Sequence, residues 1–167
     1  MNKENQKLQI VYLPIDALVP YEKNARKHTK DDVAVIIKSI EDFGFDDPIG
    51  IWSDNNIVVT GHGRLLAARE LGYKEVPCIR LDHLTDEQRK AYALTHNRSA
   101  ELSEWDEDTL NEELRALEAD FDLIKLGFQD FLDEETIKET DLDDEDVFVR
   151  EHEKEIECPF CGEKFLI

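Results

Sequence analysis

Apolar and polar residues follow a pattern that predicts a mixed α/β fold for the first hundred residues. Short apolar runs bounded by turn residues predict strands at residues 8–12, 48–52, 57–60 and 76–81. The polar triplet Asp54-Asn55-Asn56 separates the second strand from the third and predicts a hairpin. Because helical segments alternate with these strands, the fold class expected is α/β, with α and β elements mixed.

Helix ends are marked by capping residues. Thr29 and Asp32 form a capping-box pattern that opens a helix, and Gly44 ends this helix. Thr85 and Gln88 repeat the pattern at the start of a helix that continues to about residue 98. A further helix is expected to begin with Ser103 as its cap. Its apolar face carries three leucines, namely Leu110, Leu114 and Leu117.

The segment 57–72 combines a strand, a glycine-rich turn and a helix. The turn is Gly61-His62-Gly63-Arg64, and Gly72 stands where the helix should end. A strand that passes through Gly-x-Gly directly into a helix leaves backbone N–H groups free at the positive end of the helix dipole. The turn therefore predicts a site for a phosphate or another anion, although the same pattern also occurs in turns without a ligand. The apolar face expected for the helix consists of Leu65, Leu66, Ala68 and Leu71.

Two basic features accompany this turn. Arg64 falls in the first helical turn, where the dipole disfavours a cation that has no anionic partner. The loop Asn24-Ala25-Arg26-Lys27-His28 gathers three basic residues before a helix start. The loop is either a plain exposed connection or, with Arg26 and His28, a second side of the same anion site.

Charge is distributed unevenly. The net charge is −20, but residues 1–100 carry a net −1 and residues 101–167 a net −19. This acidity argues against non-specific binding of duplex DNA and favours a solvated acidic linker over a DNA mimic. The sequence contains no apolar run long enough to span a membrane and no signal-peptide core at residues 1–7, so a cytoplasmic location is expected.

Several separated motifs support a family resemblance. They are Asn24-Ala25-Arg26, Lys38-Ser39-Ile40, Gly44, Pro48-Ile49, Gly61-His62-Gly63-Arg64 with Ala67-Ala68, and Val76-Pro77. In this order and spacing the chain resembles the ParB/sulfiredoxin-type N-terminal (ParB-type nuclease) domain over residues 8–100. The version with a Gly-His-Gly-Arg turn is similar to ParB-like modules of phages and mobile elements, which often precede a DNA methyltransferase domain.

The resemblance implies that Gly61, Gly63 and Arg64 bind nucleotide phosphates, with Asn97 assisting and Arg26 and His28 able to approach the same site. His62, which replaces a Glu of the family's turn, either donates to a phosphate oxygen as a further ligand or only fills space. It also implies ATP or CTP with Mg²⁺ as the ligand. Sulfiredoxin chemistry is excluded, because His62 occupies the position of the reactive cysteine.

The resemblance leaves nucleotide hydrolysis open. The Glu-Asn pair of nucleotide-hydrolysing ParB proteins corresponds here to His96-Asn97, and an imidazole is a poor ligand for Mg²⁺. Glu41 or Asp42 could replace the missing carboxylate as a base or metal ligand, or both could be ordinary solvated residues.

The C-terminal sequence Cys158-Pro159-Phe160-Cys161-Gly162 has the spacing of half a zinc knuckle. His152 is a candidate third ligand, and a knuckle of a second chain could complete the site in a homodimer. A redox role for the cysteine pair is disfavoured, since no thioredoxin-like pattern surrounds it.

The resulting hypothesis divides the chain into a ParB-like domain (8–100), a helical extension (101–135), an acidic linker (136–157) and a Cys-x-x-Cys knuckle (158–167). We expect a nucleotide-binding accessory module of a phage or mobile element that acts in DNA modification, partition or transcription. Its partner would be DNA, contacted directly or through a protein such as a methyltransferase. The alternatives are a ParB-like nuclease or nucleotide-dependent kinase or hydrolase with Glu41 as base, and a protein–protein adaptor with an acidic tail.

Overall fold

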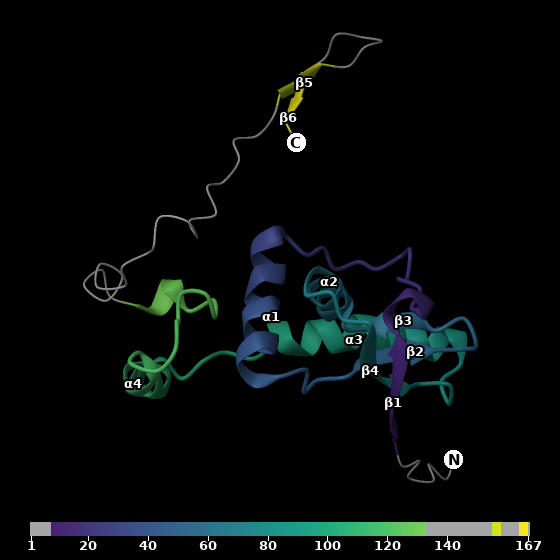
Figure 1. Ribbon diagram of the computed structural model, residues 1–167, viewed down its shortest axis with the longest axis horizontal. Coiled ribbons are helices and arrows are strands. Elements are labelled where there is room, and N and C mark those ends of the chain that lie inside the picture. The colour runs from purple at the N-terminus through teal and green to yellow at the C-terminus, as the bar shows by residue number, and fades with distance from the viewer. Residues whose placement is uncertain (1–7, 133–154, 158–163, 167) are drawn as a thin grey trace. The chain divides into compact units, whose positions relative to one another are not determined.

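The structure is a computed structural model that describes residues 8–132 and the backbone of two short strands, Glu155–Glu157 and Lys164–Leu166. Contacts divide the chain into two units, Met1–Phe131 and Leu132–Ile167. The described elements of the first unit are β1 (Ile10–Pro14), η1 (Ile15–Ala17), α1 (Lys30–Phe43), β2 (Ile49–Trp52), β3 (Ile57–Thr60), α2 (His62–Glu70), β4 (Glu75–Arg80), α3 (Asp86–Glu101), α4 (Glu107–Leu117) and η2 (Gln129–Phe131) (Figure 1).

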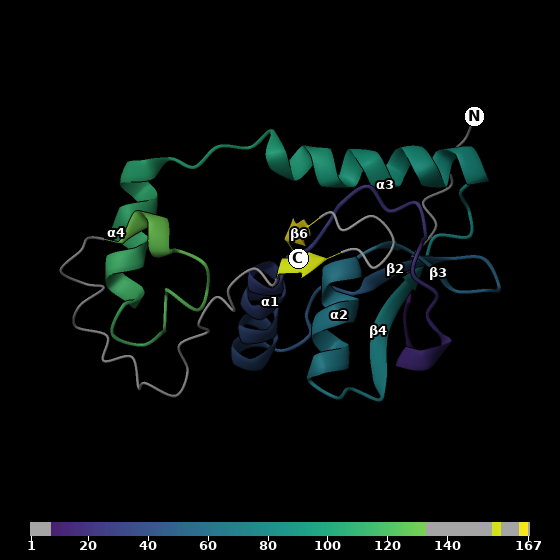
Figure 2. The same cartoon turned by 90° about the horizontal axis from the view of Figure 1, so that it is seen from above.

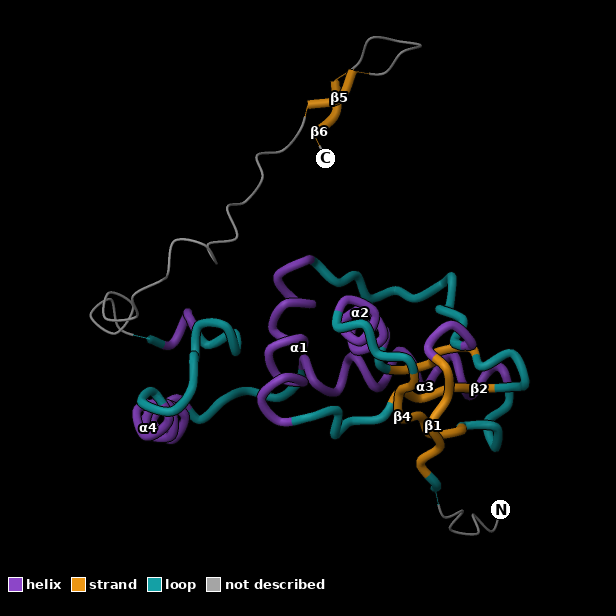
Figure 3. The backbone as a smooth tube through the Cα atoms, viewed as in Figure 1, coloured by secondary structure: helices purple, strands orange, loops and turns teal. Residues whose placement is uncertain are grey.

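The first unit is built on a four-stranded sheet with the order β1-β4-β2-β3. β1 runs antiparallel to β4, β4 runs parallel to β2, and β2 and β3 form the predicted hairpin. Figure 3 shows the strands of this sheet grouped together in orange, with α1 and α2 to one side of them. The mixed α/β fold class predicted from the sequence is confirmed. In the second unit, β5 (Glu155–Glu157) pairs antiparallel with β6 (Lys164–Leu166).

α2 lies between the sheet and α1, and it buries side chains on both sides. Leu65 and Ala68 join the core of the sheet, whereas Ala67 packs against Val33 and Ile40 of α1. The apolar face predicted for this helix is therefore wrong at Leu66, which is 40% exposed. Ala67 takes its place because α2 is covered by a second helix as well as by the sheet.

The predicted capping boxes are present. The side chains of Thr29 and Asp32 exchange hydrogen bonds with each other's backbone at the start of α1, and Thr85 and Gln88 do the same at α3. Both pairs satisfy N–H groups that a helix start would otherwise leave unpaired. Gly44 ends α1, as predicted.

The prediction of Ser103 as the cap of the next helix is wrong. The Ser103 hydroxyl donates back to the Ser99 carbonyl at 3.4 Å, and Asp106 caps α4 by accepting a hydrogen bond from the Thr109 N–H at 3.0 Å. Of the three leucines predicted for its apolar face, Leu110 and Leu114 are buried, but the prediction is wrong at Leu117, which is 39% exposed. No helix in the described part of the chain combines the length and hydropathy needed to cross a membrane.

Candidate functional site

The centre of the candidate site is the turn of residues 61–64, where β3 passes into α2. Gly61 adopts a left-handed conformation (φ +87°) and precedes the first residue of the helix. The first helical hydrogen bond runs from the Leu65 N–H to the Gly61 carbonyl at 3.0 Å, and no side chain caps this end. The N–H groups of residues 62–64 therefore lie at the positive end of the helix dipole without an intrahelical acceptor, which is the geometry that binds anions.

The two glycines allow other segments to approach the turn closely. A Cβ atom on Gly63 would lie 2.7 Å from Ile36 Cδ1 and 3.1 Å from His28 Cε1. A Cβ on Gly61 would lie 3.1 Å from Arg64 Nη1, and the positive φ would strain any other residue there. Gly63 thus lets α1 and the loop before it contact the helix start, and Gly61 permits the turn itself.

His62 lies under the loop that joins η1 to α1. Its Nε2 accepts a hydrogen bond from the Tyr21 backbone N–H at 3.3 Å. Burial lowers the pKa of His62, and the nearby His28 lowers it further. Both the hydrogen bond and the shift favour a neutral imidazole whose Nε2 is an acceptor, so His62 stabilises the loop over the turn.

Arg64 has the anionic partner that its position requires. Its guanidinium forms an ion pair with Asp47, on the loop between α1 and β2, and burial lowers the Arg64 pKa. The Asp47 carboxylate therefore compensates the positive charge of Arg64, which the helix dipole disfavours in the first turn of α2. A bound anion at the turn would compete with Asp47 for this group.

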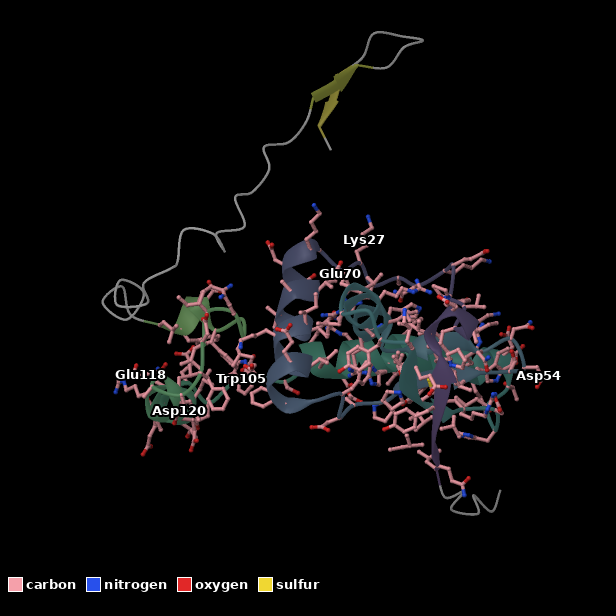
Figure 4. The ribbon with its side chains drawn as sticks, in the orientation of Figure 1. Lys27, Asp54, Glu70, Trp105, Glu118 and Asp120 are labelled. Atoms are coloured by element: carbon pink, nitrogen blue, oxygen red, sulfur yellow. The ribbon has the colours of Figure 1, made fainter. Side chains whose placement is uncertain are left out.

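The basic loop is connected to the end of α3. Arg26 Nη1 donates to Glu101 Oε1 at 3.0 Å, and Glu101 also pairs with Arg98 at 3.0 Å. In Figure 2, α3 passes beside the end of α2 on its way towards α4. Asn97 lies one helical turn before Glu101, so it shares the face of α3 that bears this ion pair. Lys27 extends outward from the same loop above α2 (Figure 4).

Among the predicted residues, the structure places His28 against Gly63. Arg26 pairs instead with Glu101 at the end of α3, the helix that also carries Asn97. Glu41 lies away from the turn. It is eleven residues along α1 from Lys30, where the helix begins next to His28, and this separation is about 16 Å along the helix axis. It is exposed and makes no hydrogen bond or ion pair with the turn in the described residues.

No group of three or more His, Cys, Asp or Glu side chains within the described ranges is arranged to hold a metal ion. The predicted zinc ligands Cys158, Cys161 and His152 lie outside the described residues, and their role stays a prediction. Cys78, by contrast, is fully buried in β4, and burial raises the pKa of its thiol to about 11.

Sequence reasoning missed three residues of the site, namely Tyr21, Asp47 and Glu101. Each acts through a partner that is distant in the sequence, so no local motif identifies it. One signal was available for Asp47: the unfavourable position of Arg64 in the first helical turn requires an anion nearby.

The N-terminal part of the chain is similar to a known protein family and to a bacterial protein. The family model described as the ParB N-terminal domain matches residues 1–98. The ParB-like nuclease domain-containing protein YnaK of Escherichia coli (strain K12) is 43% identical over 86 residues, which cover 52% of this chain and 98% of that protein.

Similarity to solved structures extends over about half of the chain or more. The C-terminally truncated chromosome-partitioning protein ParB from Caulobacter crescentus, complexed with CTP-gamma-S, has a TM-score of 0.57 and 20% sequence identity. The match covers 65% of this chain and 62% of that one. Sulfiredoxin from Arabidopsis thaliana has a TM-score of 0.40 and 24% identity, over 44% of this chain and 85% of that one.

Proposed function

The chain belongs to the ParB N-terminal domain family, and on this premise we propose that it is a nucleotide-binding module whose ligand places its phosphates at the turn of residues 61–64. The observation that carries the proposal is the uncapped start of α2, where the backbone N–H groups of residues 62–64 have no intrahelical acceptor and Arg64 belongs to the same first turn. This combination of helix dipole, free donors and a cation suits a phosphate.

In the proposed complex, the N–H groups of residues 62–64 donate to phosphate oxygens and Arg64 exchanges its bond to Asp47 for one to the nucleotide. His28 and Arg26 approach the phosphates from the loop, and Asn97 approaches from α3. His62, held neutral by burial, keeps Tyr21 and the loop in place. The protein's part in this state is to bind and orient the phosphates.

ATP and CTP are the proposed ligands, bound with Mg²⁺. The Caulobacter ParB was solved with CTP-gamma-S, which makes CTP the first nucleotide to test. The donor set around the turn is suited to phosphate more than to a metal, because its side chains are mostly cationic or imidazole groups. We therefore propose that Mg²⁺ is held mainly by the phosphates of the nucleotide.

We place this module in DNA modification, partition or transcription by a phage or mobile element. The acidic C-terminal third favours action through a partner protein, such as a methyltransferase, over direct non-specific contact with DNA. Homodimerisation through the C-terminal cysteines is part of the same proposal.

A second candidate is an enzyme, because the relative YnaK carries a nuclease domain in its name. Glu41 is the proposed base for hydrolysis, and its distance from the His28 end of α1 makes it a weaker candidate than the phosphate turn is for binding. Detectable Mg²⁺-dependent turnover that Glu41→Gln abolishes would support the enzyme.

A protein–protein adaptor is the remaining alternative. It is favoured if partner binding survives Arg64→Ala but is lost when residues 136–167 are removed.

The test of the binding proposal is calorimetric titration of CTP and ATP, each with Mg²⁺, into the wild type, Arg64→Ala and Arg69→Ala. Arg69 is the matched control, since it is an exposed arginine in the last turn of the same helix. We expect saturable binding that Arg64→Ala weakens at least tenfold and Arg69→Ala leaves unchanged. No binding of either nucleotide to the wild type would refute the proposal and leave the family assignment intact.

A further inference from the structure

An apolar groove lies between α1 and α4, separate from the phosphate turn. Its volume is about 730 Å³. Figure 4 shows Trp105 at this place, between α4 and α1. The lining includes Val35 and Phe43 from α1, Trp105 and Leu117 at the two ends of α4, and Phe128 from the following segment.

The groove is built by specific contacts of the segment after α4. The Phe121 ring lies 5.5 Å from the Phe43 ring, and the Phe128 ring lies 6.5 Å from Trp105. The backbone of Gly127 passes so close to Val35 that a Cβ there would be 3.2 Å from the Val35 side chain. These contacts hold the segment against α1, so the groove has a fixed floor.

Large apolar side chains remain accessible at the groove. Trp105 is 64% exposed, Phe43 is 51% exposed and Leu117 is 39% exposed. All three line one continuous cavity, which distinguishes them from isolated apolar residues on a surface. Clustered aromatic residues of this kind are typical of protein-binding surfaces.

The surroundings of the groove are acidic. Residues 101–132 contain eleven Asp and Glu residues against two basic residues, Arg115 and Lys125. Asp106 and Glu113 line the groove itself. Among the cations near it, Lys38 is already paired with Asp42 and Lys125 with Asp122. An apolar floor with an acidic rim is complementary to a ligand that is apolar on one side and basic on the other.

We propose that this groove binds a basic amphipathic helical segment of a partner protein, with apolar anchors at helical spacing in the cavity and Lys or Arg side chains against the rim. Residues 133–167 of the same chain are a poor occupant, because they carry fourteen acidic residues against four basic ones. A second copy of the chain, with its net charge of −20, is disfavoured for the same reason.

The test uses the full chain and a fluorescent synthetic peptide of about 20 residues, with leucines on one helical face and lysines on the other. A second peptide with glutamate in place of every lysine is the charge control. Binding is measured by fluorescence anisotropy for the wild type, Trp105→Ala, Leu117→Ser and the control Leu94→Ser. Leu94 is an exposed leucine on α3 outside the groove, and none of these substitutions changes the charge.

We expect the basic peptide to bind the wild type, with at least roughly tenfold weaker binding to Trp105→Ala and Leu117→Ser and no change for Leu94→Ser. The acidic peptide should not bind. Equal binding of the basic peptide to all four proteins would overturn the proposal, because it would place the interaction on the acidic tail. Failure of the basic peptide together with saturable binding of a fatty acid in the groove would overturn it in favour of a small apolar ligand.

Discussion

Arg64 and Asp47, seventeen residues apart in the sequence, form an ion pair at the start of α2. The Asp47 side chain is far more exposed than that of Arg64, so the carboxylate can turn to solvent while the guanidinium stays beside the turn. The pair keeps a cation where the helix dipole alone would disfavour it. It also makes Asp47 a competitor of any anion that binds there.

Asp47→Asn should therefore increase nucleotide affinity. An exposed ion pair contributes up to about 1 kcal/mol, so removing the competing charge should lower the dissociation constant by up to roughly fivefold. Calorimetric titration of CTP with Mg²⁺ measures this directly. Asp46→Asn removes the same charge one residue earlier and should have a much smaller effect; equal effects of the two variants would assign the change to general electrostatics.

His62 should make the stability of the fold depend on pH. Its pKa is lowered in the folded chain from the ordinary value of 6.5. Below pH 6.5, the unfolded chain then binds a proton that the folded chain excludes. The free energy of unfolding should fall as pH decreases from 6.5 towards the folded-state pKa, with a slope of at most about 1.4 kcal/mol per pH unit.

Urea unfolding between pH 5 and 7.5 tests this dependence. His62→Gln keeps a hydrogen-bond acceptor for the Tyr21 N–H without the titration, so it should show a smaller slope than the wild type. His83→Gln, at an exposed histidine in the turn after β4, should leave the slope unchanged. If the free energy of unfolding of His62→Gln depended on pH as steeply as that of the wild type, the pH dependence could not be assigned to His62.

Gly63→Ala should weaken nucleotide binding while leaving the free energy of unfolding nearly unchanged. Alanine favours the helix over glycine by about 1 kcal/mol, and this gain should offset the displacement of Ile36 Cδ1. His28 must also move, because its ring lies 3.1 Å from the new Cβ. We expect a free energy of unfolding within about 1 kcal/mol of the wild type and clearly weaker nucleotide binding.

The control for this prediction is Gly72→Ala, where a Cβ meets nothing within 4 Å. Gly72 has a positive φ of 72°, so this variant should lose stability without a direct effect on His28. Unchanged affinity in Gly63→Ala would show that His28 takes no part in binding.

The zinc proposal for the C-terminal cysteines is tested by metal content. Cys158→Ser and Cys161→Ser should each remove bound Zn²⁺, because two thiolates are required from this motif. Cys78→Ser is the matched control, since a buried thiol with a pKa of about 11 is protonated at neutral pH and does not bind metal. His152→Ala tests the third ligand. A wild type purified without zinc that also fails to bind added zinc would rule the site out.

Local chemistry in the sequence was enough to predict the elements and the turn. The capping pairs Thr29 with Asp32 and Thr85 with Gln88 are short-range, and each needs only its own helix start. The strand, Gly-x-Gly and helix order of residues 57–72 likewise fixes where free N–H groups lie. These features can therefore be predicted before any tertiary contact is known.

Predictions from the sequence failed where contacts between distant parts of the chain decide which residues are buried, capped or paired. Leu66 fits an apolar helical stripe, but the position of α1 makes Ala67 the buried residue. Ser103 is a good cap by type, yet Asp106 caps the helix because Ser103 bonds to Ser99. The bond between Asp47 and Arg64 depends on a loop from another part of the chain, which no spacing rule predicts.

Arg89 shows the same dependence and yields the last prediction. It is an arginine on an otherwise exposed helix, yet it is only 3% exposed. Its guanidinium carbon lies 4.3 Å from the centroid of the Tyr21 ring and 5.1 Å from that of Trp52, and Nη2 donates to Asp86 at 2.7 Å. Since the Tyr21 N–H donates to His62, Arg89 also supports the loop over the phosphate turn.

Arg89→Ala should lower the free energy of unfolding by roughly 2–4 kcal/mol, because it removes both cation–π contacts and leaves a cavity beside the two rings. Arg89→Lys should recover only part of this loss, since an ammonium group cannot stack as a planar guanidinium does. Lys90→Ala also removes a partner of Asp86 but is exposed, so its cost should stay below about 0.5 kcal/mol. Urea unfolding measures all three. If Arg89→Ala costs no more than Lys90→Ala, the stack does not hold the loop, and the stability of the turn must come from α1 and Gly63 instead.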